Sequence, residues 1–444
     1  MAIVSISRIQ HRRGLKADLP VNLNEGELGW CLDTRELYIG NGNTFTGNTQ
    51  VLTVWSNNSQ LINHTYVGDT GVPAVGAVPR TLGAILDDYL NVKDYGAIGN
   101  GVADDTAAIQ QAINDEWARL IASPSQQMSR STINFPAGTY KISASIKLLP
   151  YITLNGEGVN RTSIVLASGA SGPVFVTADS LGQTGANIGT NGGIIPTSIN
   201  VKNMSVDGST DALHPVVLLQ RCSGITLSSV SITGAWLTGS APSTASPGIV
   251  VQSLGNAVVT SDITFSSTNI KHCSNAVVID DPVTRVIVSG CQMTYNYNGI
   301  ALKGGASGPS YVQITNSEFR HISAQGLYVS TTNRGVSSVN NMYSDVGSIA
   351  GVPAIYWASG SHACTSIGDV FSSEVRALQI YDANPSRNLV LDAQQTGIVT
   401  NAPEPLTATL TANQVDADSG VRWSLSGNTS CMIQVLYSIT WLTY

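Results

Sequence analysis

Three pairs of polar residues recur along the middle of the chain, with one intervening residue inside each pair. They are Asn269 and Lys271, Gln292 and Thr294, and Glu318 and Arg320. Because side chains two positions apart on a β-strand point to the same face, each pair would lie on one side of a strand. Amides, hydroxyls and charged groups gathered in this way suit hydrogen bonding to sugar hydroxyls. The alternative is a solvated sheet face with no ligand.

A second set of side chains follows each pair, where we expect the strand to bend. These residues are His272, Tyr295, His321 and Asp345. Tyr295 would place an aromatic ring beside the polar pairs. The candidate glycan-binding residues are therefore Asn269, Lys271, Gln292, Thr294, Tyr295 and Arg320.

Four carboxylates are the candidates for catalysis. A glycosidase needs two carboxyl groups about 5–5.5 Å apart to retain configuration, or about 6.5–9.5 Å apart to invert it. Glu318 and Asp345 are one pair, although strand and rung spacings put their backbones roughly 11 Å apart. Asp280 and Asp281 are the other, although the proline that follows them is typical of a turn.

Other chemistry has less support in the sequence. His272 and His321 offer an acid and a base for a lyase. The six histidines and six cysteines show no spacing typical of metal ligands. No GxSxG-type nucleophile motif occurs. We therefore expect no metal and no cofactor.

These residues can act together only if the chain is built of stacked repeats. Six segments align when their first residues are taken as Ile199, Ile225, Ile263, Val286, Val312 and Val336. The residues two and seven positions later are also apolar, apart from Ser338 and Tyr343. The residues four positions later favour turns: Asn203, Ser229, Ser267, Gly290, Asn316 and Asn340. This pattern predicts a parallel β-helix with inward-facing apolar columns.

A solenoid also needs a cap over its first rung, which would otherwise expose a strand edge. Asp104, Asp105 or Thr106 can cap a helix whose buried stripe includes Ile109 and Ile113. The segments KDYGAIGNGVADDTAAIQQAI and FPAGTYKIS resemble the entry to pectin-lyase-like right-handed β-helices, as found in phage tailspikes. The resemblance implies that this helix is the lid of the solenoid.

The N-terminal segment predicts a small β-unit. Two apolar runs, residues 27–32 and 36–39, flank Asp33-Thr34-Arg35 and predict a β-hairpin. Arg12-Arg13-Gly14, EGELG from residue 25 and LYIGNG from residue 37 resemble the N-terminal attachment module of phage tail-fibre and tailspike proteins. The resemblance implies that residues 1–55 dock on other tail or baseplate proteins of a virion.

Charge and hydropathy exclude several classes of function. The formal net charge is −7 and 11% of residues are charged, so phosphate-directed binding to nucleic acid is not expected. No apolar run reaches the roughly 18 residues of a membrane span, so no membrane insertion is expected. The first residues show no cleavable signal pattern, which predicts synthesis in the host cytoplasm.

Both ends of the solenoid carry apolar residues with no obvious partner. Leu82, Ile85, Leu86 and Leu90 have helical spacing in the connector, residues 56–90. Residues 386–444 have the pattern of antiparallel strands and end in LYSITWLTY, which resembles the terminal strands of trimeric phage spikes. These features predict a homotrimer.

The sequence therefore predicts an all-β protein in four parts: an attachment module (1–55), a connector (56–90), a right-handed parallel β-helix with its capping helix (91–385) and a C-terminal β trimerisation region (386–444). The expected function is that of a phage tail-fibre or tailspike subunit in the virion that recognises a host surface polysaccharide. One alternative is a tailspike depolymerase that acts as glycosidase or lyase. Another is a purely structural baseplate or tail appendage.

Overall fold

The structure is a computed structural model of the 444-residue chain. It describes residues 11–42, 47–51, 63–66, 75–86, 89–122, 131–235, 245–255, 258–305, 307–330, 332–347, 352–372, 380–383 and 388–391. Residues 392–444, which include most of the expected C-terminal strands, lie outside the described part. Within the described residues, no helix is long and apolar enough to cross a membrane.

The N-terminal module is a four-stranded sheet of β1 (His11–Gly14), β2 (Leu28–Cys31), β3 (Leu37–Ile39) and β4 (Thr49–Val51), with a short 3-10 helix, η1 (Lys16–Asp18). Strands β2 and β3 pair antiparallel, which confirms the predicted hairpin. The buried carboxylate of Glu27 accepts hydrogen bonds from the backbone amide and the side-chain amide of Asn24, and it forms an ion pair with Arg12. The Asn24 amide, followed by Arg12, lowers the pKa of Glu27. The matched basic and acidic motifs thus meet in one ion pair.

The connector does not form the single apolar helix that the spacing predicted. It contains β5 (Asn63–His64), β6 (Arg80–Thr81) and the five-residue helix α2 (Leu82–Leu86). Leu90 lies beyond this helix and packs against the core of the solenoid, and its carbonyl accepts a hydrogen bond from the Asn134 amide at 2.8 Å. The predicted stripe is therefore divided between two elements, because Leu90 has a partner within the chain.

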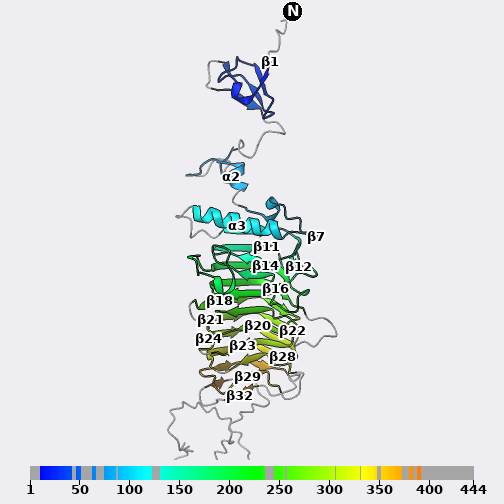
Figure 1. Cartoon of the computed structure of the whole chain (residues 1–444), viewed down its shortest axis with the longest axis vertical. Coiled ribbons are helices and arrows are strands. Elements are labelled where there is room, and N and C mark those ends of the chain that lie inside the picture. The colour runs from blue at the N-terminus through cyan, green and yellow to red at the C-terminus, as the bar shows by residue number, and fades with distance from the viewer. Residues whose placement is uncertain are drawn as a thin grey trace, which may run out of the picture. The chain divides into compact units, whose positions relative to one another are not determined.

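The capping helix forms as predicted. After η3 (Val92–Tyr95) and β7 (Asn100–Asp104), α3 (Thr106–Ala122) lies over the first rungs (Figure 1) and buries Ile109 and Ile113. Asp104 accepts a hydrogen bond from the Thr106 amide at 3.0 Å. Hydrogen bonds from Ser143 and Thr106 lower the pKa of Asp104 to about 2. Asp105 instead holds the preceding turn, through the amides of Ile98 and Gly99.

The body is a parallel β-helix, as predicted, and each rung contributes to three faces (Figure 1). The opening rungs contain β8 (Ser131–Phe135), β9 (Gly138–Ile142), β11 (Ile152–Gly156) and β12 (Thr162–Leu166), followed by the long strands β14 (Thr197–Asp207) and β16 (Ser223–Thr233). The later rungs divide at the turn into two strands. The first-strand face contains β18 (Thr260–Ser266), β21 (Val283–Ser289), β24 (Ser310–Thr315), β27 (Arg334–Val339) and β30 (Thr365–Ile367). The second-strand face contains β19 (Asn269–Lys271), β22 (Gln292–Asn296), β25 (Glu318–Ile322), β28 (Met342–Val346) and β31 (Val370–Phe371).

The third face is a nine-stranded parallel sheet. Its members are β10 (Ile146–Leu148), β13 (Phe175–Thr177), β15 (Val217–Gln220), β17 (Ile249–Gln252), β20 (Asn275–Ile279), β23 (Asn298–Leu302), β26 (Leu327–Val329), β29 (Ile355–Trp357) and β32 (Ile380–Asp382). Tyr328, Tyr356 and Tyr381 stack on its outer side with ring centroids 5.3 and 5.0 Å apart. This tyrosine ladder was not predicted from the sequence.

The register of the rungs matches the prediction at every column that was aligned. Ile199, Ile225, Ile263, Val286, Val312 and Val336 are successive Cα partners, and all are buried. The turn residues between the first and second strands all have left-handed backbones, with φ from 50° to 61°: Asn203, Ser229, Ser267, Gly290, Asn316 and Asn340. A left-handed residue is what allows so tight a bend between two strands.

The amide that follows each turn is buried in the later rungs and needs an acceptor. The Cys291 amide donates to Ser317 Oγ (3.1 Å), and the Ser317 amide donates to Asn341 Oδ1 (2.8 Å). The Asn341 amide then donates to Asp369 Oδ1 (2.8 Å). Each rung thus satisfies the buried amide of the rung before it. This internal ladder ties the rungs together at the same corner as the turn column.

The solenoid continues beyond the boundary predicted at residue 385. Strand β33 (Leu389–Leu391) pairs in parallel with β30, and the Leu389 amide bonds the Cys364 carbonyl at 2.8 Å. These residues were expected to begin an antiparallel region. The apolar alternation of a short strand does not reveal whether its partner runs parallel or antiparallel, which explains the error.

Replacing Asn316 tests the turn column. Asn316 is exposed and has φ of 50°, so Asn316→Val should destabilise the fold by about 1–2 kcal/mol through backbone strain alone. Asn316→Gly, which tolerates this φ, is the matched control and should leave stability nearly unchanged. Urea unfolding followed by circular dichroism measures both variants. Equal midpoints for the two would contradict the assigned role.

Replacing Asp369 tests the internal ladder through pH. Burial raises the pKa of Asp369, although Ser366 and Asn341 donate hydrogen bonds to it. A raised folded-state pKa stabilises the fold below the unfolded-state pKa, and this stabilisation is lost as pH rises through the folded-state value. The free energy of unfolding of Asp369→Asn should therefore rise relative to that of wild type on going from pH 4 to pH 7. A difference that does not change with pH would contradict this.

Candidate functional site

The predicted polar pairs form two adjacent columns on the second-strand face. Asn269, Gln292 and Glu318 are successive partners, as are Lys271, Thr294 and Arg320. We call these six residues the second-strand patch. Gln292 Nε2 donates to Glu318 Oε2 at 3.3 Å, whereas Asn269 Oδ1 is buried and has no hydrogen-bond partner among the described residues. The structure therefore brings together the residues that the sequence grouped.

The residues expected at the bend form a ladder along one corner of the solenoid. His272, Tyr295, His321 and Asp345 all have left-handed backbones, with φ from 51° to 58°. The Tyr295 ring stacks on His321 at 4.6 Å between centroids and lies 6.0 Å from His272. His321 Nδ1 lies 2.6 Å from Asp345 Oδ2. Burial, followed by the charge of Lys271, lowers the pKa of His272. We call these four residues the corner ladder.

The four candidate carboxylates lie in two different parts of the solenoid. Glu318 is paired in register with Met342 of the next rung, and Asp345 is engaged with His321. Asp280 and Asp281 follow β20 on the nine-stranded face, where Asp281 accepts the Ser307 amide at 3.3 Å. Glu318 and Asp345 lie on adjacent strands of the second-strand face, whereas Asp280 and Asp281 follow a strand of the nine-stranded face, so the four carboxylates do not form one site.

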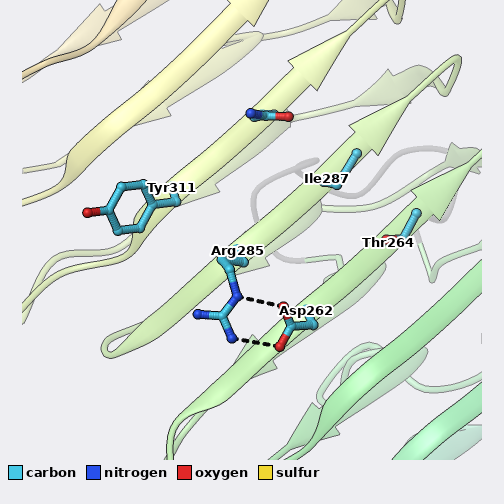
Figure 2. A pocket seen from close by; sticks show the side chains of 6 residues that line it. Asp262, Thr264, Arg285, Ile287 and Tyr311 are labelled. Carbon is cyan, nitrogen blue, oxygen red and sulfur yellow. Dashed lines mark hydrogen bonds and ion pairs between the residues drawn. The ribbon is translucent and has the colours of Figure 1, made fainter.

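A surface that the sequence analysis missed lies on the first-strand face (Figure 2). A hollow of about 520 Å³ is bounded by one column of Asp262, Arg285 and Tyr311 and a second column of Thr264, Ile287 and Gln313. A second hollow of about 500 Å³ lies on the other side of Tyr311 and includes Thr284, Ser310 and Arg334. These volumes are typical of ligand sites. The signal was available, because the columns lie directly before and after the aligned rung starts.

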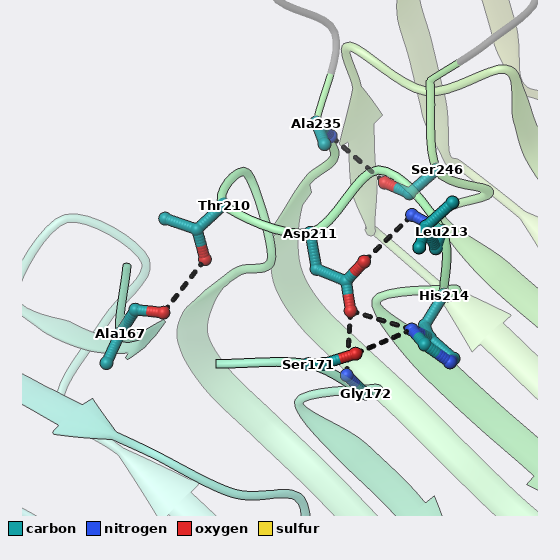
Figure 3. Close-up of polar contacts among 9 residues, drawn as sticks. All are labelled: Ala167, Ser171, Gly172, Thr210, Asp211, Leu213, His214, Ala235 and Ser246. Atoms are coloured by element: carbon teal, nitrogen blue, oxygen red, sulfur yellow. Dashed lines mark hydrogen bonds and ion pairs between the residues drawn. The ribbon is translucent and has the colours of Figure 1, made fainter. Parts of the chain in front are cut away.

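A serine, a histidine and an aspartate meet in a loop near the start of the solenoid (Figure 3). His214 Nδ1 lies 2.8 Å from Asp211 Oδ2 and 3.4 Å from Ser171 Oγ. Both contacts use the same ring nitrogen, so the histidine cannot pass a proton from serine to its other side as in a catalytic triad.

Asp211 has a structural role in this cluster. Its carboxylate accepts the amides of Gly172 (2.7 Å) and Leu213 (2.8 Å). Burial acts to raise the pKa of Asp211, but these amides and His214 outweigh it and the pKa is lowered. Among the described residues, no group of His, Cys, Asp and Glu could hold a metal ion.

A parallel β-helix with polar outer columns defines the class of this protein. The model of the rhamnogalacturonase A/epimerase, pectate lyase-like family matches residues 89–348, and the chain belongs to this family. A second model, the major tropism determinant N-terminal domain, matches residues 9–44. The resemblances of the N-terminal motifs and of the capping-helix segment are thereby confirmed, whereas the resemblance of LYSITWLTY falls on residues outside the described part.

Curated relatives match only short parts of their own length. A probable glucan endo-1,3-beta-glucosidase of Arthroderma benhamiae is 34% identical over 24% of this chain and 12% of its own length. The mannuronan C5-epimerase AlgE4 of Azotobacter vinelandii is 30% identical over 28% of this chain and 20% of its own length.

Among solved structures, a tailspike protein mutant of E. coli bacteriophage HK620 is 14% identical with a TM-score of 0.46, covering 78% of this chain and 65% of that one. Geobacillus virus E2 ORF18 is 14% identical with a TM-score of 0.41, covering 87% of this chain and 72% of that one.

Proposed function

We propose that this chain is a phage tail-fibre or tailspike subunit, made in the host cytoplasm and built into the virion, that recognises a host surface polysaccharide through its β-helix. The observation that carries the proposal is the occurrence of a tropism-determinant N-terminal domain and a pectate-lyase-like solenoid in one chain. The first would attach the subunit to other tail or baseplate proteins. The second would present its outward columns to the host.

The outer surface of the solenoid supports a saccharide as the ligand. The second-strand patch offers an amide, a hydroxyl and charged groups at one-rung intervals, next to the half-exposed ring of Tyr295. Relatives named as a glucanase and a mannuronan epimerase point to the same class of ligand. Sparse charge and many rigidly placed polar groups suit a polysaccharide better than nucleic acid.

Binding without cleavage agrees best with the carboxylates. His321 engages the carboxylate of Asp345, and the amide of Ser307 donates to Asp281, so two of the four candidate carboxylates already have partners within the described chain. The depolymerase alternative rests on the His321–Asp345 contact, which could supply an acid and a base. The structural-appendage alternative predicts no adsorption to cells at all.

We expect the double variant Tyr295→Ala, Arg320→Ala to reduce adsorption of the purified protein to host cells by about tenfold, since it removes the ring and the cation of the patch. Wild type should adsorb without releasing new reducing ends or unsaturated sugars from the polysaccharide. Lys202→Ala, on an earlier rung, is the control and should adsorb normally. If the double variant adsorbed as well as wild type, the patch would be a solvated sheet face without a ligand. Release of new sugars by wild type would establish the depolymerase.

We further propose that the subunit is a homotrimer. Leu86 of α2 is 56% exposed and the apolar residues at the C-terminus need partners. Light scattering at micromolar concentration should give about three times the chain mass of 46.5 kDa. Removal of residues 392–444, beyond the last described strand, should abolish this state. The mass of a single chain for the intact protein would contradict the trimer.

A further inference from the structure

Tyr311 projects from the first-strand face between the two hollows (Figure 2). Its side chain is 69% exposed, although it belongs to a strand of the rigid solenoid. It follows Asp262 and Arg285 in a column of left-handed residues, with φ of 58°, 57° and 56°. A large aromatic side chain at such a backbone position is uncommon, and its exposure shows that it does not fill the core.

Both neighbours in the column leave the Tyr311 ring uncovered. Arg285 is held by Asp262 on its other side, through two hydrogen bonds of 2.6 and 2.7 Å (Figure 2). The next rung has Gly335 at this position, and a Cβ there would lie 3.7 Å from Cδ1 of Tyr311. Tyr295 and Tyr328, in contrast, stack on neighbouring rings. Tyr311 therefore offers its aromatic surface to a ligand.

The hollows on either side supply groups suited to a sugar ring. Ile287, 41% exposed, and Thr264 line one hollow, next to the amide of Gln313. In the other, Ser310 Oγ donates to Thr284 Oγ1 at 3.2 Å, which leaves hydroxyl groups at the wall. An apolar surface with a few fixed polar groups is the usual composition of a small-molecule site.

This surface carries one positive charge that is not neutralised by a neighbouring side chain of the described residues, that of Arg334. Asp262 and Arg285 neutralise each other. Arg334 is exposed in the second hollow, and within the described part of the chain its guanidinium has no ion pair. Asp281, which directly precedes Pro282 in the wall of this hollow, accepts a hydrogen bond from the backbone amide of Ser307. A guanidinium of this kind pairs well with a carboxylate.

We propose that the groove on both sides of Tyr311 is a saccharide subsite, in which one sugar ring stacks on Tyr311 and the carboxylate of an acidic sugar pairs with Arg334. The inference rests on the proposed function, because it names the place and the sugar class of that recognition. It differs from the second-strand patch, which lies on another face and would contact other parts of the polymer.

The test starts with the full-length protein on an array of bacterial capsular and O-chain polysaccharides. The polysaccharide that binds is then used in titrations, alongside a derivative whose carboxyl groups have been chemically reduced to alcohols. Tyr311→Asn removes the ring and suits the left-handed backbone, so the fold should remain intact. Tyr311→Phe keeps the ring, and Tyr89→Ala, at an equally exposed tyrosine outside the groove, is the control.

We expect Tyr311→Asn to weaken binding about tenfold or more, with Tyr311→Phe within about twofold of wild type and Tyr89→Ala unchanged. Arg334→Ala should weaken binding of the native polysaccharide about tenfold, but should have no effect on the carboxyl-reduced derivative. If Arg334 had only a structural role, Arg334→Ala would weaken binding of both polysaccharides equally. This comparison also keeps the proposal testable if Tyr311→Asn fails to fold.

Two results would overturn the inference alone: equal affinities for wild type and a folded Tyr311→Asn, or equal binding of native and reduced polysaccharide by wild type. If wild type binds no polysaccharide on the array or on host cells, the proposed function fails and the inference fails with it.

Discussion

The column of left-handed turn residues between the first and second strands, held at constant register, is the constraint on which the structure depends. It turns the chain between the first and second strands at Asn203 and at each equivalent position through Asn340. Because strand side chains alternate, a slip of one residue would move the apolar columns outward and the polar columns inward. The buried amides that follow the turns are satisfied by Ser317, Asn341 and Asp369 of successive rungs. Turn and ladder together fix which side chains can reach a ligand.

The function proposed here follows from that rigidity. A solenoid presents side chains from strands, at intervals of one rung, and so matches a polymer whose units also repeat. Tyr295 and Tyr311 illustrate two uses of the same framework. The first is stacked within the corner ladder, and the second stands uncovered because Gly335 follows it and Asp262 holds Arg285.

Much of the fold was predictable from the sequence because single columns carry it. Ile199 and its five equivalents, the turn residues and the hairpin around Asp33 were all read from residue type and spacing. The Tyr311 groove was not predicted, although its columns flank the aligned rung starts, because it depends on the direction that the Arg285 side chain takes toward Asp262. The prediction of one helical stripe in the connector was wrong for a similar reason. Leu90 packs against the core of the solenoid, and such a tertiary contact is not visible in the spacing of apolar residues. The strand Leu389–Leu391 gave no sequence signal of its parallel partner.

Oxidative footprinting tests the central claim most directly, because it reports the exposure of named side chains in the intact protein. Hydroxyl radicals would be generated with and without saturating host polysaccharide, and modified peptides quantified by mass spectrometry. The account predicts that bound polysaccharide protects Tyr311 several-fold, while Tyr89, equally exposed when free, is oxidised at an unchanged rate. Equal oxidation of Tyr311 with and without bound polysaccharide would contradict it.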